Sequence, residues 1–370
     1  GIDQEETYLI LYPDAPLEKQ REILFLRETN EHIAVWEGDK LTKKDGTDFS
    51  GIKSVLWNDQ FDQTLKHLIG FAEYVYLNMN ENDRMETSVP DKDIRLAREM
   101  RYKYPLHKYE RSAPIMSALR SIKHDIEVAT IQKACDITEK GFRRVLDFVK
   151  PGVMEYEVEG EIIAEFIRNR ATGHAYSPII ASGFDACVLH YVENKKECKD
   201  GDLLLMDFGA EYANYASDLT RTIPVNGRFS ERQKEVYNAC LKVHNEAKNM
   251  MCAGETLAEF NAEVRKVMQS ALIDIKLIDK NASDEEKTKL TQKHFPHGTS
   301  HFMGIDVHDI GNRYGKIEDG MCFTIEPGIY IREENLGVRI ENDIIIKSSG
   351  NIDLMKNIPI TVEEIEDLMN

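Results

Sequence analysis

Three histidines and four carboxylates in the second half of the chain have the types and spacing expected of metal ligands. His297, His301 and His308 fall within one stretch of twelve residues. The four carboxylates each lie in or at the end of an apolar, strand-like run: Asp207, Asp218, Glu326 and Glu341. A buried carboxylate is costly unless a partner neutralises it, and like charges close together cannot all stay ionised without cations. We therefore expect the four carboxylates and His301 to converge on two divalent metal ions at a hydrolytic site.

The composition of this ligand set indicates which metal it prefers. Four carboxylates and one neutral imidazole are mostly hard ligands, which favours Mn²⁺ and leaves Co²⁺, Fe²⁺ or Zn²⁺ as alternatives. A structural zinc site would show cysteines in ligand spacing, but the six cysteines are scattered and form no C-x-x-C pair. That pattern is typical of free thiols in a reducing compartment, so we expect a cytoplasmic protein.

Each of these residues also has an ordinary structural interpretation. Taken alone, Asp207 could be a turn residue or cap, and His301 could be a buried core histidine. Glu326 could belong to the turn at Pro327-Gly328. The stretch Asp207-Phe208-Gly209 matches a metal motif of protein kinases, but the sequence has no glycine-rich loop or His-Arg-Asp loop to accompany it. The metal interpretation depends on the joint pattern, in which every ligand type occurs in order along the chain.

The segment 338–344 is expected to form one strand that reaches the metal site. Alternate residues of a strand share a face, which places Arg339, Glu341 and Asp343 on the same side. Glu341 can then point to a metal ion while Arg339 holds a neighbouring carboxylate or the substrate. Asp218 lies in a second strand-like run, and we expect that strand to reach the same cleft.

Length and charge limit the class of protein. A chain of 370 residues is too long for one ordinary core, so two domains are expected. The boundary is predicted near Arg111, with domains at 1–110 and 111–370. A formal net charge of -18 argues against nucleic-acid binding, which needs an excess of Lys and Arg. No apolar run is long enough to span a membrane, so no membrane partner is expected.

The two regions differ in the elements that their sequences predict. Residues 1–108 indicate an α/β domain, with strands at 7–12, 32–36 and 74–77 and helices at 18–27 and 62–73. We expect this domain to be a lid or an oligomerisation surface. The second region predicts helices at 131–149, at 155–170, from Ser230 onward and at 362–369, and a strand pair at 187–191 and 203–208.

An internal repeat organises the second region. Gly152, Glu157 and Glu161 recur at the same offsets as Gly254, Glu259 and Glu263, and each set follows a long amphipathic helix. A second repeat relates 199–209 to 318–328, because each has an Asp-Gly turn, an apolar strand and a terminal carboxylate. Two related halves that pack face to face would bring these carboxylates to a shared cleft.

With these residues assembled, the sequence resembles the pita-bread metallopeptidases, and within them the Xaa-Pro aminopeptidase (aminopeptidase P) family. The resemblance covers the chain from about Arg111 to the C-terminus, where all five ligands occur in order. It implies an α/β (α+β) fold with a C-terminal pita-bread catalytic domain like that of creatinase and methionine aminopeptidase. It also implies a smaller creatinase-type N-terminal α/β domain, whose front part we expect to be missing from this sequence.

The resemblance implies a role for each ligand. Asp207 would be the terminal ligand of one metal ion. Asp218 and Glu341 would bridge both ions, and His301 and Glu326 would complete the coordination of the other. A water or hydroxide bridging the two ions would be the nucleophile, and Glu326 would carry its proton toward the leaving nitrogen.

Four residues outside the metal shell also match family positions. His190 would line the substrate site. His297 and His308 would act as catalytic residues that hydrogen-bond the substrate and the developing oxyanion. Arg339 would lie beside the last ligand and contact the substrate.

The implied activity is hydrolysis of the bond between an N-terminal residue and a following proline, with peptides that carry proline second as substrates. The proline nitrogen has no N–H group, so the site need not satisfy one. The resemblance also implies a homodimer or higher homo-oligomer. Prolidase, which uses the same metals and fold on X-Pro dipeptides, is the nearest alternative.

Three other members of the same fold differ in features that this sequence shows. Methionine aminopeptidase shares the metal ligands, but an additional N-terminal domain is expected here. Creatinase has the two-domain form without this metal set. A non-catalytic pita-bread module that binds proteins would typically have lost ligands, whereas all five are retained in this chain.

Overall fold

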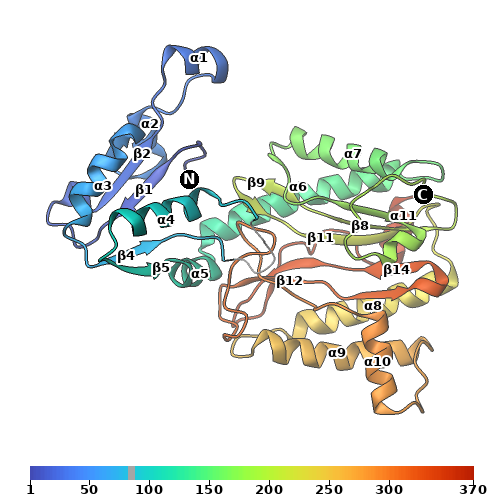
Figure 1. Ribbon diagram of the computed structural model, residues 1–370. Coiled ribbons are helices and arrows are strands. Elements are labelled where there is room, and N and C mark those ends of the chain that lie inside the picture. The colour runs from blue at the N-terminus through green and yellow to red at the C-terminus, as the bar shows by residue number, and fades with distance from the viewer. Residues whose placement is uncertain (82–87) are drawn as a thin grey trace. The chain divides into compact units, whose positions relative to one another are not determined.

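The chain folds into two compact units, Gly1–Ser112 and Ala113–Asn370, in a computed structural model that describes residues 1–81 and 88–370 (Figure 1). The first unit is built on a three-stranded sheet in the order β1-β2-β3, in which β2 runs antiparallel to β1 and parallel to β3. Its described elements are β1 (Tyr8–Leu11), η1 (Glu18–Gln20), β2 (Glu22–Leu26), α1 (Glu31–Glu37), α2 (Lys43–Ser50), β3 (Ser54–Trp57), η2 (Asn58–Gln60), α3 (Phe61–Ile69), β4 (Tyr74–Leu77), α4 (Lys92–Lys103) and β5 (Lys108–Arg111).

Two predictions for the first unit are wrong. Most of the helix expected at 18–27 is instead the central strand β2, whose apolar run from Ile23 to Leu26 is buried throughout. A short apolar run of this kind cannot be assigned to helix or strand by periodicity. The strand expected at 32–36 is helix α1, because the Asn30 side chain accepts a hydrogen bond from the Ile33 N–H at 2.8 Å and caps the first turn. The strands at 7–12 and 74–77 and the helix at 62–73 are confirmed as β1, β4 and α3.

The second unit is larger and begins with helices. Its elements are α5 (Ala113–Ser121), α6 (Asp125–Phe148), α7 (Glu155–Arg168), β6 (Gly173–His174), β7 (Ile179–Ser182), η3 (Gly183–Cys187), β8 (Leu203–Phe208), β9 (Ala210–Tyr212), β10 (Tyr215–Ala216), β11 (Leu219–Pro224), α8 (Glu231–Met250), α9 (Leu257–Asp274), α10 (Asp284–His294), β12 (Cys322–Ile325), β13 (Gly328–Ile331), η4 (Arg332–Glu334), β14 (Leu336–Arg339), β15 (Asn342–Ile345), β16 (Ile352–Asp353) and α11 (Val362–Leu368). Among the described residues, none of these helices combines the length and apolarity that a membrane crossing requires.

Strands form the middle layer of this unit. Figure 1 shows α6 and α7 on one side of β8, β11, β12 and β14, and α8 and α9 on the other side. The helix predicted at 131–149 is confirmed as α6, which buries Ile131, Phe142 and Val145 completely. The strand predicted at 187–191 is wrong, because η3 and a turn occupy this region. The partners of β8 are instead β7 and β11.

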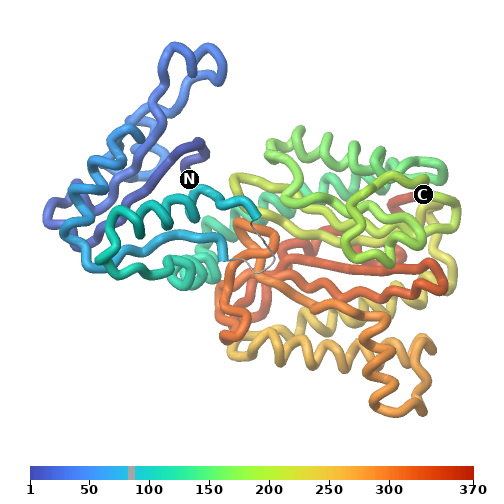
Figure 2. The backbone as a smooth tube through the Cα atoms, viewed as in Figure 1, coloured from blue at the N-terminus to red at the C-terminus, as the bar shows by residue number. Residues whose placement is uncertain are grey.

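The two segments of the predicted internal repeat can be followed in Figure 2, the first in green and the second in yellow to orange, and their turns have the same local geometry. Gly152 and Gly254 have φ values of 96° and 99°, and each donates its N–H to a carbonyl at 2.9 Å, on Cys198 and Ile317 respectively. Gly201 and Gly320, in the two Asp-Gly turns, have φ values of 85° and 88°. Because these positive φ values favour glycine, the repeated glycines fix the turns that lead into β8 and β12.

The strand expected at 338–344 is divided in two. β14 ends at Arg339 and pairs with β13, whereas β15 starts at Asn342 and pairs with β12. Glu341 lies at the break and forms an isolated antiparallel bridge with Thr220, next to the start of β11. The chain therefore changes its sheet partner at the position where a ligand was predicted.

Gly209 allows two predicted ligands to come close together. It follows Asp207 by two residues, and a Cβ atom at this position would lie 1.7 Å from the carbonyl oxygen of Ser217. Any larger residue would push the backbone before Asp218 away from the end of β8. The glycine is therefore required by space, not by its φ angle.

We predict that Gly209→Ala lowers the free energy of unfolding by at least about 1–3 kcal/mol, because the added methyl group meets backbone that cannot move cheaply. Gly160→Ala is the matched control. Gly160 lies within α7 and a Cβ atom there would meet nothing within 4 Å, so this change should leave stability equal or higher by about 0.5–1 kcal/mol. Urea unfolding of both variants measures the difference. Equal stability of Gly209→Ala and wild type would contradict this account.

Candidate metal centre

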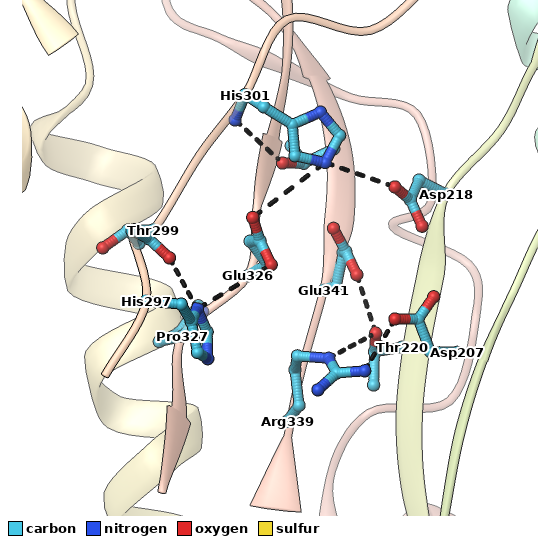
Figure 3. A network of polar contacts seen from close by, with 12 residues as sticks. Asp207, Asp218, Thr220, His297, Thr299, His301, Glu326, Pro327, Arg339 and Glu341 are labelled. Atoms are coloured by element: carbon cyan, nitrogen blue, oxygen red, sulfur yellow. Dashed lines mark hydrogen bonds and ion pairs between the residues drawn. The ribbon is translucent and has the colours of Figure 1, made fainter. Parts of the chain in front are cut away.

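The five predicted ligands come from five separate segments of the second unit. Asp207 lies near the end of β8, and Asp218 immediately precedes β11. Glu326 follows β12, and Glu341 lies between β14 and β15. His301 belongs to the loop between α10 and β12. Figure 3 shows that the side chains of all five are directed into one space.

The distances at the centre are those of a cation site. Asp218, His301 and Glu341 each offer one ligand atom, and these atoms all lie within 4.8 Å of one another. The Nε2 atom of His301 is 3.4 Å from an Asp218 oxygen and 3.9 Å from a Glu326 oxygen. Asp207 is connected to the group through Tyr176, whose hydroxyl contacts Asp207 Oδ1 at 2.6 Å and also contacts Asp218.

The charge of the cluster is not balanced by the protein alone. Burial, reinforced by the neighbouring carboxylates, raises the pKa of Asp218 and of Glu341 well above the ordinary values. Burial raises the pKa of Glu326 to about 7. The Oε1 atom of Glu341 is buried and has no hydrogen-bond partner among the described residues. A divalent cation would provide this missing partner and keep the carboxylates ionised, so the residues fit a metal centre.

His301 is held in the tautomer that a metal ligand needs. Its Nδ1–H donates to the carbonyl oxygen of Phe302 at 2.9 Å, which leaves the lone pair of Nε2 directed at the carboxylates. The backbone of His301 also pairs with Thr324, because the Thr324 N–H donates to the His301 carbonyl at 3.1 Å. The Glu326 N–H donates to the carbonyl of Thr299 at 2.8 Å. The ligand loop and the end of β12 are thus positioned together.

Hydrogen bonds from neighbouring residues orient Asp218 and Glu341. The Thr220 hydroxyl donates to Glu341 Oε2 at 2.7 Å, and the Glu341 N–H donates to the Thr220 carbonyl at 3.1 Å. Arg221, which is completely buried, donates to the Glu341 carbonyl at 2.7 Å. The Asp218 N–H donates to Oδ2 of Asp343 at 2.9 Å. These contacts fix the backbone at both ligands before any metal binds.

A hydrogen-bonded chain leads from Asp207 to His297. The Arg339 guanidinium donates to Asp207 Oδ2 at 2.6 Å and to the Tyr330 hydroxyl at 2.9 Å. Tyr330 then donates to Nε2 of His297 at 2.8 Å, since Nδ1–H of His297 donates to the Gly298 carbonyl at 2.7 Å. Burial and the nearby Arg339 lower the pKa of His297 to about 4, so this imidazole is neutral at neutral pH.

The other two predicted histidines have different surroundings. The rings of His308 and His301 meet edge to face, with 4.3 Å between their centroids. His190 lies in the turn after η3 and its side chain is exposed. Within the described part of the chain, no hydrogen bond or ion pair links His190 to the five predicted ligands. The structure therefore brings His308, but not His190, into contact with the cluster.

Three side chains of the site were not predicted from the sequence: Tyr176 and Thr220 contact predicted ligands, and Tyr330 contacts Arg339 and His297. Thr220 is two residues from Asp218, and strand alternation could have placed both on one face. Tyr330 lies in a strand, but its sequence position gives no sign that it contacts Arg339. Tyr176 lies in the irregular stretch after α7, where no periodic pattern exists to place it. The contacts of Tyr330 and Tyr176 depend on the tertiary fold, so the sequence alone does not reveal them.

Comparison with known proteins agrees with this geometry. Residues 129–348 match Metallopeptidase family M24, and residues 1–76 match Aminopeptidase P, N-terminal domain. The fold and site therefore define a metal-dependent hydrolase. The chain belongs to metallopeptidase family M24. The predicted α+β fold class, with a catalytic domain of this family and a smaller N-terminal domain, is confirmed.

Relatives with the same architecture are similar over almost the whole chain. The Xaa-Pro aminopeptidase of Escherichia coli K12 is 32% identical over 384 residues, which cover 100% of this chain and 86% of the relative. The structure of the Pseudomonas aeruginosa aminopeptidase PepP has a TM-score of 0.88 at 30% identity, covering 98% of this chain and 85% of that one. Escherichia coli aminopeptidase P with the inhibitor Pro-Leu has a TM-score of 0.83 at 33% identity, covering 94% and 82%.

We predict that the metal-free protein loses stability as the pH rises through Glu326's titration range. The pKa of Glu326 is raised from 4.5 to about 7 by burial, so the folded state holds a proton that the unfolded state releases between these values. Replacing Glu326 by Gln removes that proton. Relative to wild type, the free energy of unfolding of the variant should therefore rise by on the order of 1–3 kcal/mol as the pH increases across this window.

Urea unfolding in the presence of a chelator, from about pH 5 to about pH 8, measures this difference. Glu333→Gln is the control, because Glu333 is exposed, pairs with Lys293, and has no hydrogen bond or ion pair to the predicted ligands within the described part of the chain. Adding a divalent cation should remove the wild-type loss of stability, since the ionised carboxylate is then stabilised. A difference between wild type and Glu326→Gln that does not change with pH would contradict the prediction.

Proposed function

We infer that this chain is a metal-dependent aminopeptidase that hydrolyses the bond between an N-terminal residue and a following proline. The observation that carries the inference is that the five predicted ligands face one space, with ligand atoms of Asp218, His301 and Glu341 within 4.8 Å of one another, in a chain of metallopeptidase family M24. That chain covers 86% of curated Xaa-Pro aminopeptidases at 31% and 32% identity. Retention of all five ligands disfavours a non-catalytic binding module.

We propose that two divalent cations occupy this centre and that the ligand chemistry favours Mn²⁺. Asp207 would be a terminal ligand, Asp218 and Glu341 would bridge, and His301 with Glu326 would complete the set. This is a mostly hard ligand group, which suits Mn²⁺ better than a thiolate-preferring ion. When bound, such a pair of cations supplies a nucleophile from water at neutral pH and polarises the substrate carbonyl.

The protein's own residues would orient the peptide and move protons. Glu326 lies 3.9 Å from Nδ1 of His297 and 3.9 Å from Nε2 of His301, a position from which it could pass a proton toward the leaving nitrogen. His297 and His308 are proposed to hydrogen-bond the substrate and the oxyanion that develops on its carbonyl. To donate there, His297 would have to release the Gly298 carbonyl, to which its Nδ1–H donates. Arg339 would orient Asp207, to which its guanidinium donates, and we propose that Arg339 and His190 contact the substrate.

The proposed specificity for proline follows from its nitrogen, for which the site needs no hydrogen-bond acceptor. A proline nitrogen carries no N–H, so a peptide with proline second leaves no unsatisfied donor when it binds. We propose that the preceding residue leaves as the free amino acid. Prolidase activity remains the alternative, because an X-Pro dipeptide offers the same bond with a free carboxylate after it.

We predict that the protein loaded with Mn²⁺ releases the first residue of a tripeptide with proline second faster than it cleaves the matching X-Pro dipeptide. Glu326→Gln should lower kcat by at least about 10²-fold, the usual contribution of a positioned proton carrier. Glu333→Gln, an exposed change of the same chemistry, should leave kcat within about two-fold of wild type. Amino-acid release and metal content are measured together, also with Co²⁺ and Zn²⁺.

Each outcome of this assay separates the candidates. Cleavage of the dipeptide alone would reassign the chain to prolidase and keep the site. Cleavage of neither peptide by protein that contains metal would reject proline specificity. A chain that binds no divalent metal and cleaves nothing would instead favour a protein-binding module. Faster turnover with another ion would reject Mn²⁺ as the preferred metal.

Three further proposals concern the chain as a whole. We propose a homodimer or higher homo-oligomer, with the exposed apolar residues Val35 and Trp36 of α1 at a subunit contact. Sedimentation of wild type and Trp36→Ser tests this proposal.

We propose a cytoplasmic location, supported by six free cysteines and tested by cell fractionation. We propose domains at 1–110 and 111–370, near the division between the compact units, and limited proteolysis tests this boundary.

A further inference from the structure

A cluster of ionic side chains holds the loop that carries His301 and His308. Asp309 accepts hydrogen bonds from the Lys123 ammonium at 3.1 Å and from the Arg120 guanidinium. Lys123 follows helix α5, and its ammonium also contacts the carbonyl of Arg120. Two cations from one short segment therefore converge on the residue that directly follows His308.

Burial makes the pair unusual. The side chains of Lys123 and Asp309 are each only 1% exposed. Removing two charges from water is expensive, and an apolar pair of similar volume is often equally stable or more so. Stability alone is therefore a weak reason for this pair. A requirement for one fixed arrangement of the loop is a better one.

The pair fixes the loop at both of its ends. The Asp309 N–H donates to the Phe302 carbonyl at 2.9 Å, and Oδ1 of Asp309 accepts from the Ile310 N–H at 2.9 Å. Phe302 is the residue whose carbonyl also accepts from the ring of His301. A Cβ atom on Gly304 would lie 2.3 Å from Asp309 Oδ2, so the loop backbone packs against the ion pair with no space for a side chain.

His308 therefore has little freedom to move away from His301. It precedes Asp309, which is tied to Phe302 by its backbone and to Lys123 by its side chain. The rings of His308 and His301 are 4.3 Å apart at an interplanar angle of 87°. Movement of Asp309 would shift His308 first, while His301 keeps its own contacts to Phe302 and Thr324.

We propose that Lys123 and Asp309, supported by Arg120, are positioning residues that hold His308 in place for turnover without contributing to metal affinity. This inference rests on the proposed function, in which His308 contacts the substrate. It predicts a loss of kcat at unchanged metal content. A role only in stability would predict no change in kcat for the folded protein.

The test exchanges the whole pair, because a single change would leave a buried unpaired charge and could prevent folding. Lys123→Met with Asp309→Asn should lower kcat by about 10- to 100-fold, the usual effect of losing a residue that orients the first shell. The metal content of the purified protein should equal that of wild type. Crystal structures should show His308 displaced from the 4.3 Å ring separation seen in wild type.

Lys234→Met with Glu366→Gln is the matched control. Glu366 pairs with Lys234 at 3.3 Å and also accepts from the Phe229 N–H at 2.9 Å, so it repeats the pairing of Asp309 with a lysine and a backbone N–H, with side chains 11% and 33% exposed, at a site without predicted ligands. Its kcat should stay within about two-fold of wild type. The pair exchange is also made in a His308→Ala background, where it should change kcat by no more than about two-fold, because the residue it positions is gone.

The outcomes separate this inference from the proposed function. The inference is overturned if the Lys123/Asp309 exchange keeps wild-type kcat, if metal content falls with activity, or if the loss persists in full in the His308→Ala background. If wild type cleaves neither proline peptide, the proposed function fails. The crystal structure of the exchanged protein then decides the inference, which an undisplaced His308 would overturn.

Discussion

The crowding of four carboxylates around one buried space is the constraint on which the catalytic unit depends. One of them, Asp207, is paired with the guanidinium of Arg339 at 2.6 Å. Burial, reinforced by neighbouring carboxylates, raises the pKa of the others, and among the described residues one buried oxygen of Glu341 has no hydrogen-bond partner. A site of this kind stores electrostatic free energy that protons or divalent cations release. Metal binding is thus part of how the fold reaches its most stable state.

The fold meets this constraint by building the site from two halves. Asp207 and Asp218 come from β8 and the start of β11, while His301, Glu326 and Glu341 come from the second half of the repeat. The halves join at the bridge between Thr220 and Glu341. Arg221 fixes that join, because it donates to the carbonyls of both residues at 2.9 and 2.7 Å. The metal centre therefore forms only when the halves have packed together.

Features that depend on neighbouring residues could be predicted from the sequence, whereas contacts that depend on distant partners could not. The five residues predicted as ligands face one space in the fold, and the sequence pointed to them because carboxylates end apolar runs at corresponding positions of a repeat. The glycines of that repeat, Gly152 and Gly254, predicted matching turns because only certain residues tolerate their φ angles. The central strand β2 was mistaken for a helix because its four apolar residues carry no period. Tyr176 could not be found, because its partners are set by the fold.

Neutral and charged groups are distributed unevenly around the site. The carboxylates at the centre contact mostly neutral donors, such as the hydroxyls of Thr220 and Tyr176. A fixed positive charge among the carboxylates would compete with the cations. Fully charged groups are tolerated one layer out, where Lys123 and Asp309 neutralise each other. Arg339 is the exception, and its position opposite Asp207 places positive charge at the edge of the cluster, where it orients one ligand and leaves the central space to the metals.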